Sequence, residues 1–320
     1  MAHNLYKNVM AYAGEEVPWH KLGVQFTEPM TAAQAIEAAH LGYVVEKRPL
    51  FVIGSDGNPK AIDRVATVNT DNDEVLGVVS PSYEVVQNLD CFAFFDILLA
   101  ESGAFYETAG AIGNGERMFL LARMPEQIVA LPGDVTRPYI LLSNTHDGSG
   151  ALEARFTGIR VVCQNTLDMA IRGSKATVSI RHTVSAPQRL QVAAMILNDY
   201  RRHLARMGET IQELAEFKVD DEFIEEYTMA LFGDPSKQPE GRGRTIALNK
   251  IQMFEGRLRN GKGVDLPGVA GTAWWAWNAA VEFADYDLCF RTDRTKAILY
   301  GGGREFKQEA LDKALVLVRR

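Results

Sequence analysis

The chain has 320 residues, of which 47% are hydrophobic and 23% are charged, a balance typical of a globular protein rather than a disordered or fibrous one. The net charge of -7 argues against a protein that binds nucleic acid through its overall charge. No segment has the roughly 18 uninterrupted apolar residues that a membrane helix needs. We therefore expect a cytoplasmic protein that makes no contact with a membrane.

The three cysteines, Cys91, Cys163 and Cys289, lie far apart and form no CxxC pair. They have no histidine at the spacing of a zinc site, so we predict neither a disulfide framework nor a metal site. Two glycine-rich stretches also lack the spacing of a nucleotide site. The stretch GAIGNG is not GxGxxG, and GGGREFK lacks the GK[ST] ending of a phosphate-binding loop, so we predict no cofactor.

The first part of the chain predicts an alternation of helices and antiparallel strands. A helix capped by Thr31 precedes two or three strands in 43–80, and a buried helix follows in 86–103, closed by Gly103. The GNGE sequence predicts a hairpin in 104–125. The remaining predicted elements are a hairpin in 137–163, a short helix in 164–173 and a strand in 176–184.

Beyond residue 187 the pattern is helical almost throughout. Amphipathic helices are predicted in 189–217, 220–233, 246–261, 271–288 and 294–318. A loop rich in glycine and proline, 233–245, separates the second helix from the third and is the segment we expect to be mobile. The tryptophans of AWWAWN have helical spacing, which favours a core helix over a base-stacking surface. We predict an α+β fold, with an α+β domain over 1–186 and a helical region over 187–320.

Charge is distributed unevenly along the chain. Residues 1–150 hold nine Lys or Arg against nineteen Asp or Glu, whereas residues 151–320 hold 25 against 22. Two windows are basic: 151–210 has nine basic against four acidic residues, and 236–262 has seven against two. A local basic patch, rather than the overall charge, is what meets a phosphate backbone.

The strand expected in 151–163 predicts a basic face. Because alternate residues of a strand share a face, Arg155 and Thr157 lie opposite the apolar set that includes Phe156. The alternation slips at Gly158, which is typical of a β-bulge and would bring Arg160 to the same exposed face.

Neighbouring segments add further groups suited to phosphate oxygens. The strand in 176–184 places Arg181 on a polar face, and Asn165 near the start of the predicted short helix adds backbone N–H groups. The predicted nucleic-acid contacts are Arg155, Thr157, Arg160, Asn165, Arg172, Lys175 and Arg181, with Arg242 and Arg244 as a mobile clamp. The competing interpretation is that these side chains form only the solvated face of a half-buried sheet.

Two other functions remain open from the residues. Cys163 as a nucleophile, with His146 or His182 as base and Asp147 or Asn165 as orienting group, would make a hydrolase or transferase. By alternation, however, Cys163 points into the apolar face, where a thiol is inert. The alternative partner is a host protein, bound by an acidic first half that imitates nucleic acid.

The stretches RFTGIRVVCQNTLDMAI, IRHT, PWHKLG and GTAWWAWNAAVEFADY resemble the phage and plasmid proteins of domain-of-unknown-function family 932. The order of a helix, three strands and a helix in 31–100 also resembles the core of phage single-strand annealing proteins. The first resemblance implies a protein of a phage or plasmid, and it carries no established activity. The second implies a self-associating protein that holds single-stranded DNA along a basic groove, which here would have to come from the basic second half because residues 31–100 are acidic. Together they lead us to predict a non-enzymatic, self-associating protein of a phage or plasmid that binds or anneals single-stranded DNA in recombination or replication.

Overall fold

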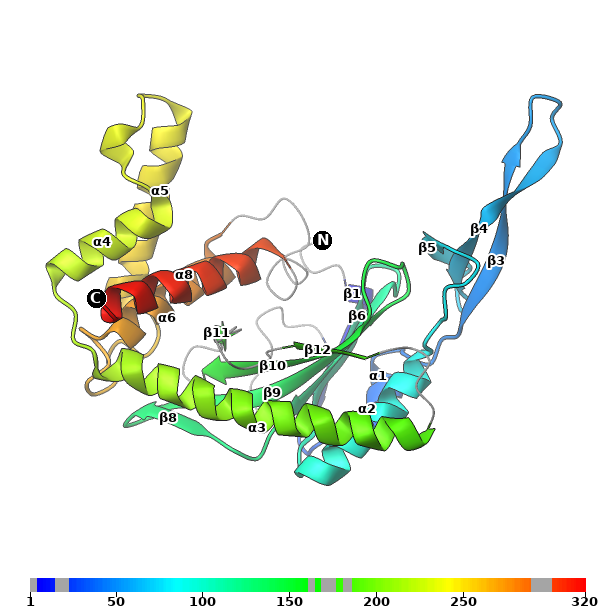
Figure 1. Ribbon diagram of the computed structural model, residues 1–320, viewed down its shortest axis with the longest axis horizontal. Helices are drawn as coiled ribbons and strands as arrows, with labels where there is room; N and C mark the ends of the chain where they lie inside the picture. Colours follow the sequence, from blue (N-terminus) through cyan, green and yellow to red (C-terminus); the bar gives the residue numbers. More distant parts are fainter. Residues whose placement is uncertain (1–4, 15–22, 161–164, 168–176, 181–185, 289–300) are drawn as a thin grey trace. The chain divides into compact units, whose positions relative to one another are not determined.

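The protein has an α+β fold in its structure, which is a computed structural model (Figure 1). The structure describes residues 5–14, 23–160, 165–167, 177–180, 186–288 and 301–320. The chain forms two compact units that interleave along the sequence. Unit 1 comprises Met1–Pro125, Tyr139–Phe156 and Thr177–Tyr200, and unit 2 comprises Glu126–Pro138, Thr157–Ala176 and Arg201–Arg320.

A large sheet forms the centre of unit 1, with its strands in the order β10-β9-β7-β6-β1-β2 and β12 paired with β10. Neighbouring strands with a described register are antiparallel, except that β2 pairs with β1 in parallel. The hairpin predicted around GNGE is confirmed as β6 and β7, and Gly113 and Gly115 turn the chain with φ of 69° and 101°. The strands are β1 (Leu5–Ala13), β2 (Val24–Phe26), β6 (Phe105–Ile112), β7 (Arg117–Arg123), β9 (Asp134–Thr145), β10 (Leu152–Arg160) and β12 (Thr177–Ile180).

A second, three-stranded sheet of unit 1 confirms the strands predicted in 43–80. It consists of β3 (Val45–Ile53), β4 (Pro59–Asn69) and β5 (Glu74–Val79), all antiparallel. Helices α1 (Ala32–Ala38) and α2 (Asn88–Ser102) flank it in the sequence. Thr31 caps α1 through a capping box, and Gly103 ends α2 in the left-handed conformation with φ of 70°, as the sequence predicts.

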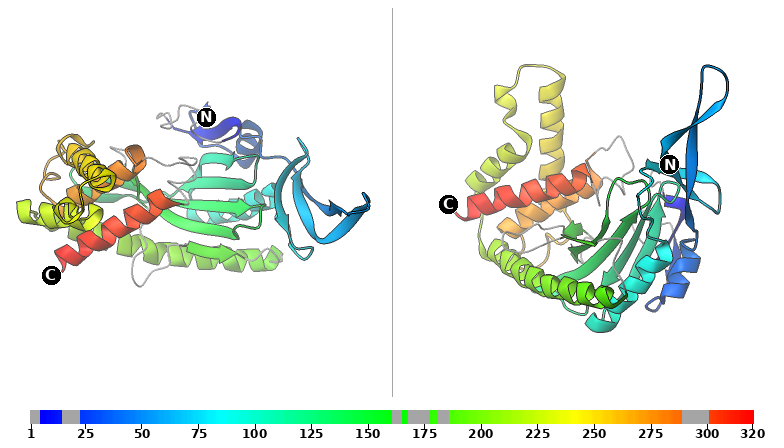
Figure 2. Two further views of the ribbon diagram at one scale, coloured as in Figure 1. Left: turned by 90° about the horizontal axis from the view of Figure 1, so that it is seen from above. Right: turned by 45° about the vertical axis from the view of Figure 1, so that its right-hand side comes forward.

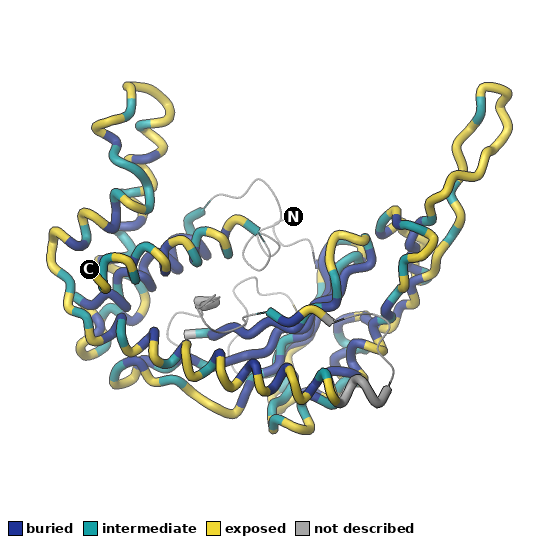
Figure 3. The backbone as a smooth tube through the Cα atoms, in the orientation of Figure 1, coloured by how far each residue is buried: buried dark blue, intermediate teal, exposed yellow. Residues whose placement is uncertain are grey.

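The outer half of the β3–β4 hairpin carries apolar side chains without a core beneath them. Phe51 is 54% exposed and Ile53 is 73% exposed, and both lie on the same face of β3. Figure 2 shows the hairpin projecting beyond the large sheet of unit 1, and Figure 3 shows its outer half exposed along both strands. Isolated two-stranded ribbons are marginally stable in water, so the inner half of the hairpin, next to β5, must hold the outer half in place.

Unit 2 consists mainly of helices. It contains the second half of α3 (Ala186–Glu216), then α4 (Asp221–Phe232), the 3-10 helix η1 (Pro235–Lys237), α5 (Arg242–Asn260), α6 (Ala273–Tyr286) and α8 (Gly302–Val318). Two short strands, β8 (Ile128–Leu131) and β11 (Asn165–Leu167), also belong to it. The predicted long amphipathic helix is confirmed as α3.

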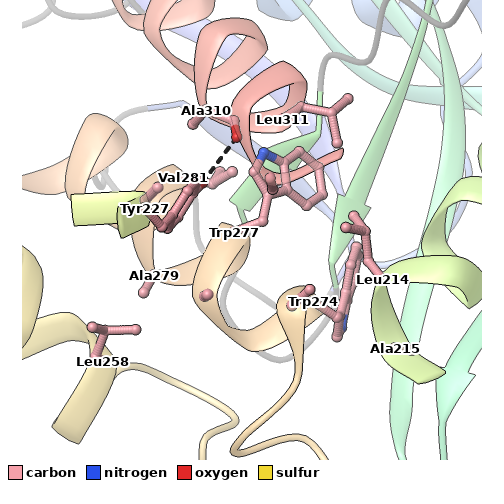
Figure 4. Packing of buried hydrophobic residues seen from close by; sticks show 14 of the residues in the cluster. Leu214, Ala215, Tyr227, Leu258, Trp274, Trp277, Ala279, Val281, Ala310 and Leu311 are labelled. Atoms are coloured by element: carbon pink, nitrogen blue, oxygen red, sulfur yellow. Dashed lines mark hydrogen bonds between the residues drawn. The ribbon is translucent and has the colours of Figure 1, made fainter. Parts of the chain in front are cut away.

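Helix α6 forms the core of unit 2, as the AWWAWN sequence predicts (Figure 4). Trp274 and Trp277 are fully buried, and each indole N–H donates a hydrogen bond, to Asp134 at 2.8 Å and to the Lys307 carbonyl at 3.3 Å. Tyr227 of α4 donates to the Ala310 carbonyl of α8 at 3.0 Å. The two buried tryptophans are therefore packing residues, and they are not available to stack on bases.

Candidate nucleic-acid interface

Strand β10 does not present the predicted basic face, because it is buried on both sides. Arg155 and Thr157 are only 3% and 4% exposed, and Ala154 and Phe156 on the opposite face are 0% and 1% exposed. The Phe156 ring packs against Tyr200 of α3 with the ring centroids 5.7 Å apart. The predicted exposure of Arg155 and Thr157 is therefore wrong. Alternation shows which side chains share a face, but it does not show whether a neighbouring element covers that face.

The anion site predicted at the start of a short helix is also wrong, because Asn165 begins a strand. Residues Asn165–Leu167 form β11, which pairs antiparallel with the end of β10, and Arg160 lies opposite Asn165. Pairing with β10 satisfies backbone groups that the sequence pattern assigned to a helix. An extended segment has no helix dipole to offer an anion.

The rest of the predicted cluster lies outside the described residues. Arg172, Lys175 and Arg181 are not described, nor are the side chains of Arg160 and Asn165. Within the described part of the chain, the predicted contacts that remain at the surface are Arg242 and Arg244.

His146, the base of the alternative enzyme, lies in the core of unit 1. It is 0% exposed, and its Nε2 lies 2.9 Å from Oδ1 of Asn88, which is also 0% exposed. The Oδ1 of Asp147 accepts the backbone N–H of Ser149 at 2.9 Å. Cys163 and His182 lie outside the described residues. The described part of the chain therefore offers no solvent-facing histidine at this position.

The buried polar groups around His146 tie the three-stranded sheet to the loops of the large sheet. Thr67 Oγ1 donates to the His146 carbonyl at 2.6 Å, and Tyr43 donates its hydroxyl proton to the Gly115 carbonyl at 2.6 Å. Asn69 donates to the Tyr6 hydroxyl at 3.0 Å. Each bond satisfies a group that would otherwise be costly to bury, so we interpret this cluster as structural.

Burial of tyrosines gives a test of this packing at alkaline pH. Burial raises the pKa of Tyr43, Tyr106 and Tyr227, and for Tyr106 the hydrogen bond to Asp96 raises it further. A tyrosine whose pKa in the folded protein is raised above the usual value near 10 favours the folded state. Its contribution to stability is fully present below about pH 10 and is lost as the pH rises through the raised pKa. We expect at most seven of the ten tyrosines to ionise while the protein remains folded, because three are held neutral. Tyrosinate absorbance recorded together with circular dichroism checks this, and ionisation of more than seven of the ten tyrosines before unfolding would contradict it.

Arg242 and Arg244 lie in the first turn of α5, and not in the mobile loop that the sequence predicted. The helix begins at Arg242, after Gly241, whose backbone has φ of 144°. Arg242 is exposed and Arg244 is half-buried. The segment predicted as a mobile clamp is therefore helical, although the glycines of EGRGR, residues 240–244, indicated a loop.

The start of α5 concentrates positive electrostatic potential. Gly241 supplies no side-chain cap for the first N–H groups, and the first turn contains no acidic residue. The helix dipole adds partial positive charge at this end, where cations such as Arg242 and Arg244 are ordinarily unfavourable. A bound anion would relieve this repulsion and accept hydrogen bonds from the free N–H groups.

One exposed stripe of α5 alternates cations with apolar side chains. Arg242, Ile246, Lys250 and Met253 follow one another at helical spacing, and Ile246 and Met253 are 45% and 50% exposed. Among the described residues, no carboxylate pairs with Arg242, Arg244 or Lys250. We call Arg242, Ile246, Lys250 and Met253 the α5 stripe. The sequence contained a signal for Ile246 and Lys250, because their i+4 and i+8 spacing from Arg242 places all three on one face of a helix.

The other end of α5 is fixed to the core of unit 2. Phe254 and Leu258 are buried in it, and Arg257 holds Asp287 through two hydrogen bonds of 2.6 and 2.8 Å and Glu282 through one of 2.7 Å. These hydrogen bonds, first those to Asp287, raise the pKa of Arg257 above its usual value. The stripe therefore lies on a helix whose far end is anchored. Figure 1 labels α5, and Figure 3 shows its start as exposed.

A search of the described residues found no group of three or more metal-ligating side chains, and no described helix is long and apolar enough to cross a membrane. A sequence model of the family described as "Domain of unknown function (DUF932)" matches residues 75–299. The chain belongs to this family, which confirms the resemblance to family 932 itself. No curated protein and no solved structure matches the chain.

Proposed function

We propose that the protein binds single-stranded DNA through the first half of α5, as a self-associating protein that serves a phage or plasmid in recombination or replication. The observation that supports it is the start of α5, where Arg242 and Arg244 and the uncapped N–H groups share one positive end. Lys250 extends the cationic surface by two helical turns, so the helix can contact successive phosphates.

The apolar members of the stripe favour a single strand over a duplex. Ile246 and Met253 lie between and beside the cations, and they can contact the faces of unstacked bases. In a duplex those faces are hidden by stacking, so only the phosphates and groove edges remain accessible. Contacts of this kind read no base edges, and we therefore expect affinity that depends on salt and hardly at all on sequence.

The test is a titration of fluorescent single-stranded DNA, the matching duplex and the matching RNA at two salt concentrations. Arg242→Gln/Lys250→Gln is expected to weaken single-strand binding about tenfold or more at low salt, and to reduce the salt slope by about two, one for each lost phosphate contact.

The matched control, Arg206→Gln/Lys237→Gln, removes the same charge from exposed side chains outside α5 and should bind like the unmodified chain. Absence of binding at low salt, or an equal loss of affinity in the control, would overturn the proposal. If the RNA or the duplex bound more tightly, that nucleic acid, and not single-stranded DNA, would be the ligand.

A further inference from the structure

A small groove in unit 2 lies at the end of α3, the start of α4 and the end of α8. Its volume is about 210 Å³, and its apolar side chains are Phe217, Phe223 and Leu317. Sites for small molecules are generally larger, about 300 Å³ or more, so this groove suits one or two apolar side chains of a protein. The other lining residues are charged: Lys218, Asp220, Glu222, Glu226 and Arg320.

Acids outnumber cations in and beside the groove, because α4 carries acids and no bases, although Lys218 and Arg320 also line it. Asp221, Glu222, Glu225 and Glu226 all lie in its first two turns and are exposed. Glu226 pairs with Arg320 at 2.7 Å. Among the described residues, the other three acids have no cation within ion-pairing distance. An apolar floor inside a negatively charged rim fits an apolar side chain flanked by cations.

The α5 stripe has this chemistry. Ile246 stands one turn from Arg242 and one turn from Lys250, so an exposed apolar side chain lies between two cations. With Arg244, the start of α5 carries three cations for which no carboxylate partner is found among the described residues. The groove offers them Glu222 in its lining, with Asp221 and Glu225 beside it on α4.

A single molecule cannot fill its own groove with its own stripe. The acids lie at the beginning of α4, which has 12 residues and is therefore about 18 Å long. Helix α5 starts only after the far end of α4 and η1, and its other end is fixed by Phe254 and Arg257 (Figure 1). The groove and the α5 stripe of one molecule can therefore be filled only by other molecules.

We propose that the α5 stripe of one copy docks in the acidic groove of a second copy. The contact joins two different surfaces, so repeated docking gives a closed ring or an open filament rather than a dimer related by a two-fold axis. This inference does not require nucleic acid, but DNA and the groove compete for the same cations. Self-association through this contact is therefore strongest in the DNA-free protein and weakens as salt screens the charges.

Charge reversal of either surface tests the contact in the full chain by sedimentation velocity at low salt. Arg242→Glu/Lys250→Glu and Glu222→Lys/Glu225→Lys are each expected to weaken self-association at least about tenfold, because like charges then face one another. The four substitutions combined in one chain should restore association, because the reversed stripe again meets an oppositely charged groove. Circular dichroism confirms that each variant is folded.

Three results would overturn the inference: a monomeric unmodified chain at high concentration, reversed variants that associate unchanged, or a folded combined variant that stays monomeric. The groove variant also separates this proposal from the proposed function. It leaves the α5 stripe intact, so it should lose self-association while still binding single-stranded DNA. Loss of DNA binding in the α5 variant alone, with self-association unchanged, would support the function and refute the groove contact.

Discussion

Lys307→Met is expected to lower the free energy of unfolding by about 3–5 kcal/mol, because it removes the cation that faces a buried carboxylate. Lys307 of α8 is 0% exposed, and its Nζ lies 3.0 Å from Oδ1 of Asp285, whose side chain is 9% exposed. Methionine fills similar space without strain, so the loss reports the buried Asp285 charge rather than a cavity. Urea unfolding followed by tryptophan fluorescence measures it, since Trp277 lies in the same core.

Two further variants distinguish buried charge from general damage. Lys307→Met/Asp285→Asn removes both charges and should regain most of the loss, because neutral partners carry no large desolvation penalty. Arg206→Met removes an exposed ion pair with Glu209, whose side chains are 55% and 65% exposed, and should cost less than about 1 kcal/mol. A loss of similar size in all three variants would contradict the argument.

Most helices and hairpins were predictable from the sequence because local signals determine them. Thr31 and Gly103 end their helices through side-chain and backbone chemistry that acts within one turn. The tryptophan helix α6 was predictable for a different reason. Its apolar residues surround the whole helix, which is possible only in a core.

The predicted basic face failed where the prediction depended on a distant element. The sequence of β10 determines that Arg155 and Thr157 share one face and Phe156 the other. It does not contain the information that both faces are covered, since that depends on segments such as α3 that follow much later in the chain. The failure at Asn165 has the same cause, because its pairing with β10 is a tertiary contact that overrides the helical pattern.

The start of α5 shows the opposite error. Two glycines and the preceding prolines indicated a loop, but Arg242, Arg244 and Thr245 join a helix of 19 residues. Glycine costs about 1 kcal/mol in a helix, and the burial of Phe254 and Leu258 further along the helix outweighs this cost. The consequence is that Arg242 and Arg244, expected in a mobile loop, instead lie in the first turn of a helix.

Asn88→Leu is expected to lower the free energy of unfolding by about 4 kcal/mol, because it removes the partner of two buried groups at about 1–3 kcal/mol each. Asn88 Oδ1 lies 2.9 Å from His146 Nε2, and its Nδ2 donates to the Leu41 carbonyl at 3.0 Å. Leucine has similar volume but can satisfy neither group. Asn72→Ala, which affects only an exposed turn where the side chain accepts the Glu74 N–H, should change stability by about 0.5 kcal/mol or less.

The same variant tests whether the buried polar groups around His146 have a structural role. If the region is structural, Asn88→Leu should increase amide hydrogen exchange at His146, because the His146 N–H donates to the Glu116 carbonyl at 2.7 Å. The proposed binding of DNA through α5 should remain unchanged, because none of these groups lies on that helix. A variant that unfolds at the same urea concentration as the unmodified chain would show that His146 is not locked in the core. The histidine would then again be a candidate base for an enzyme.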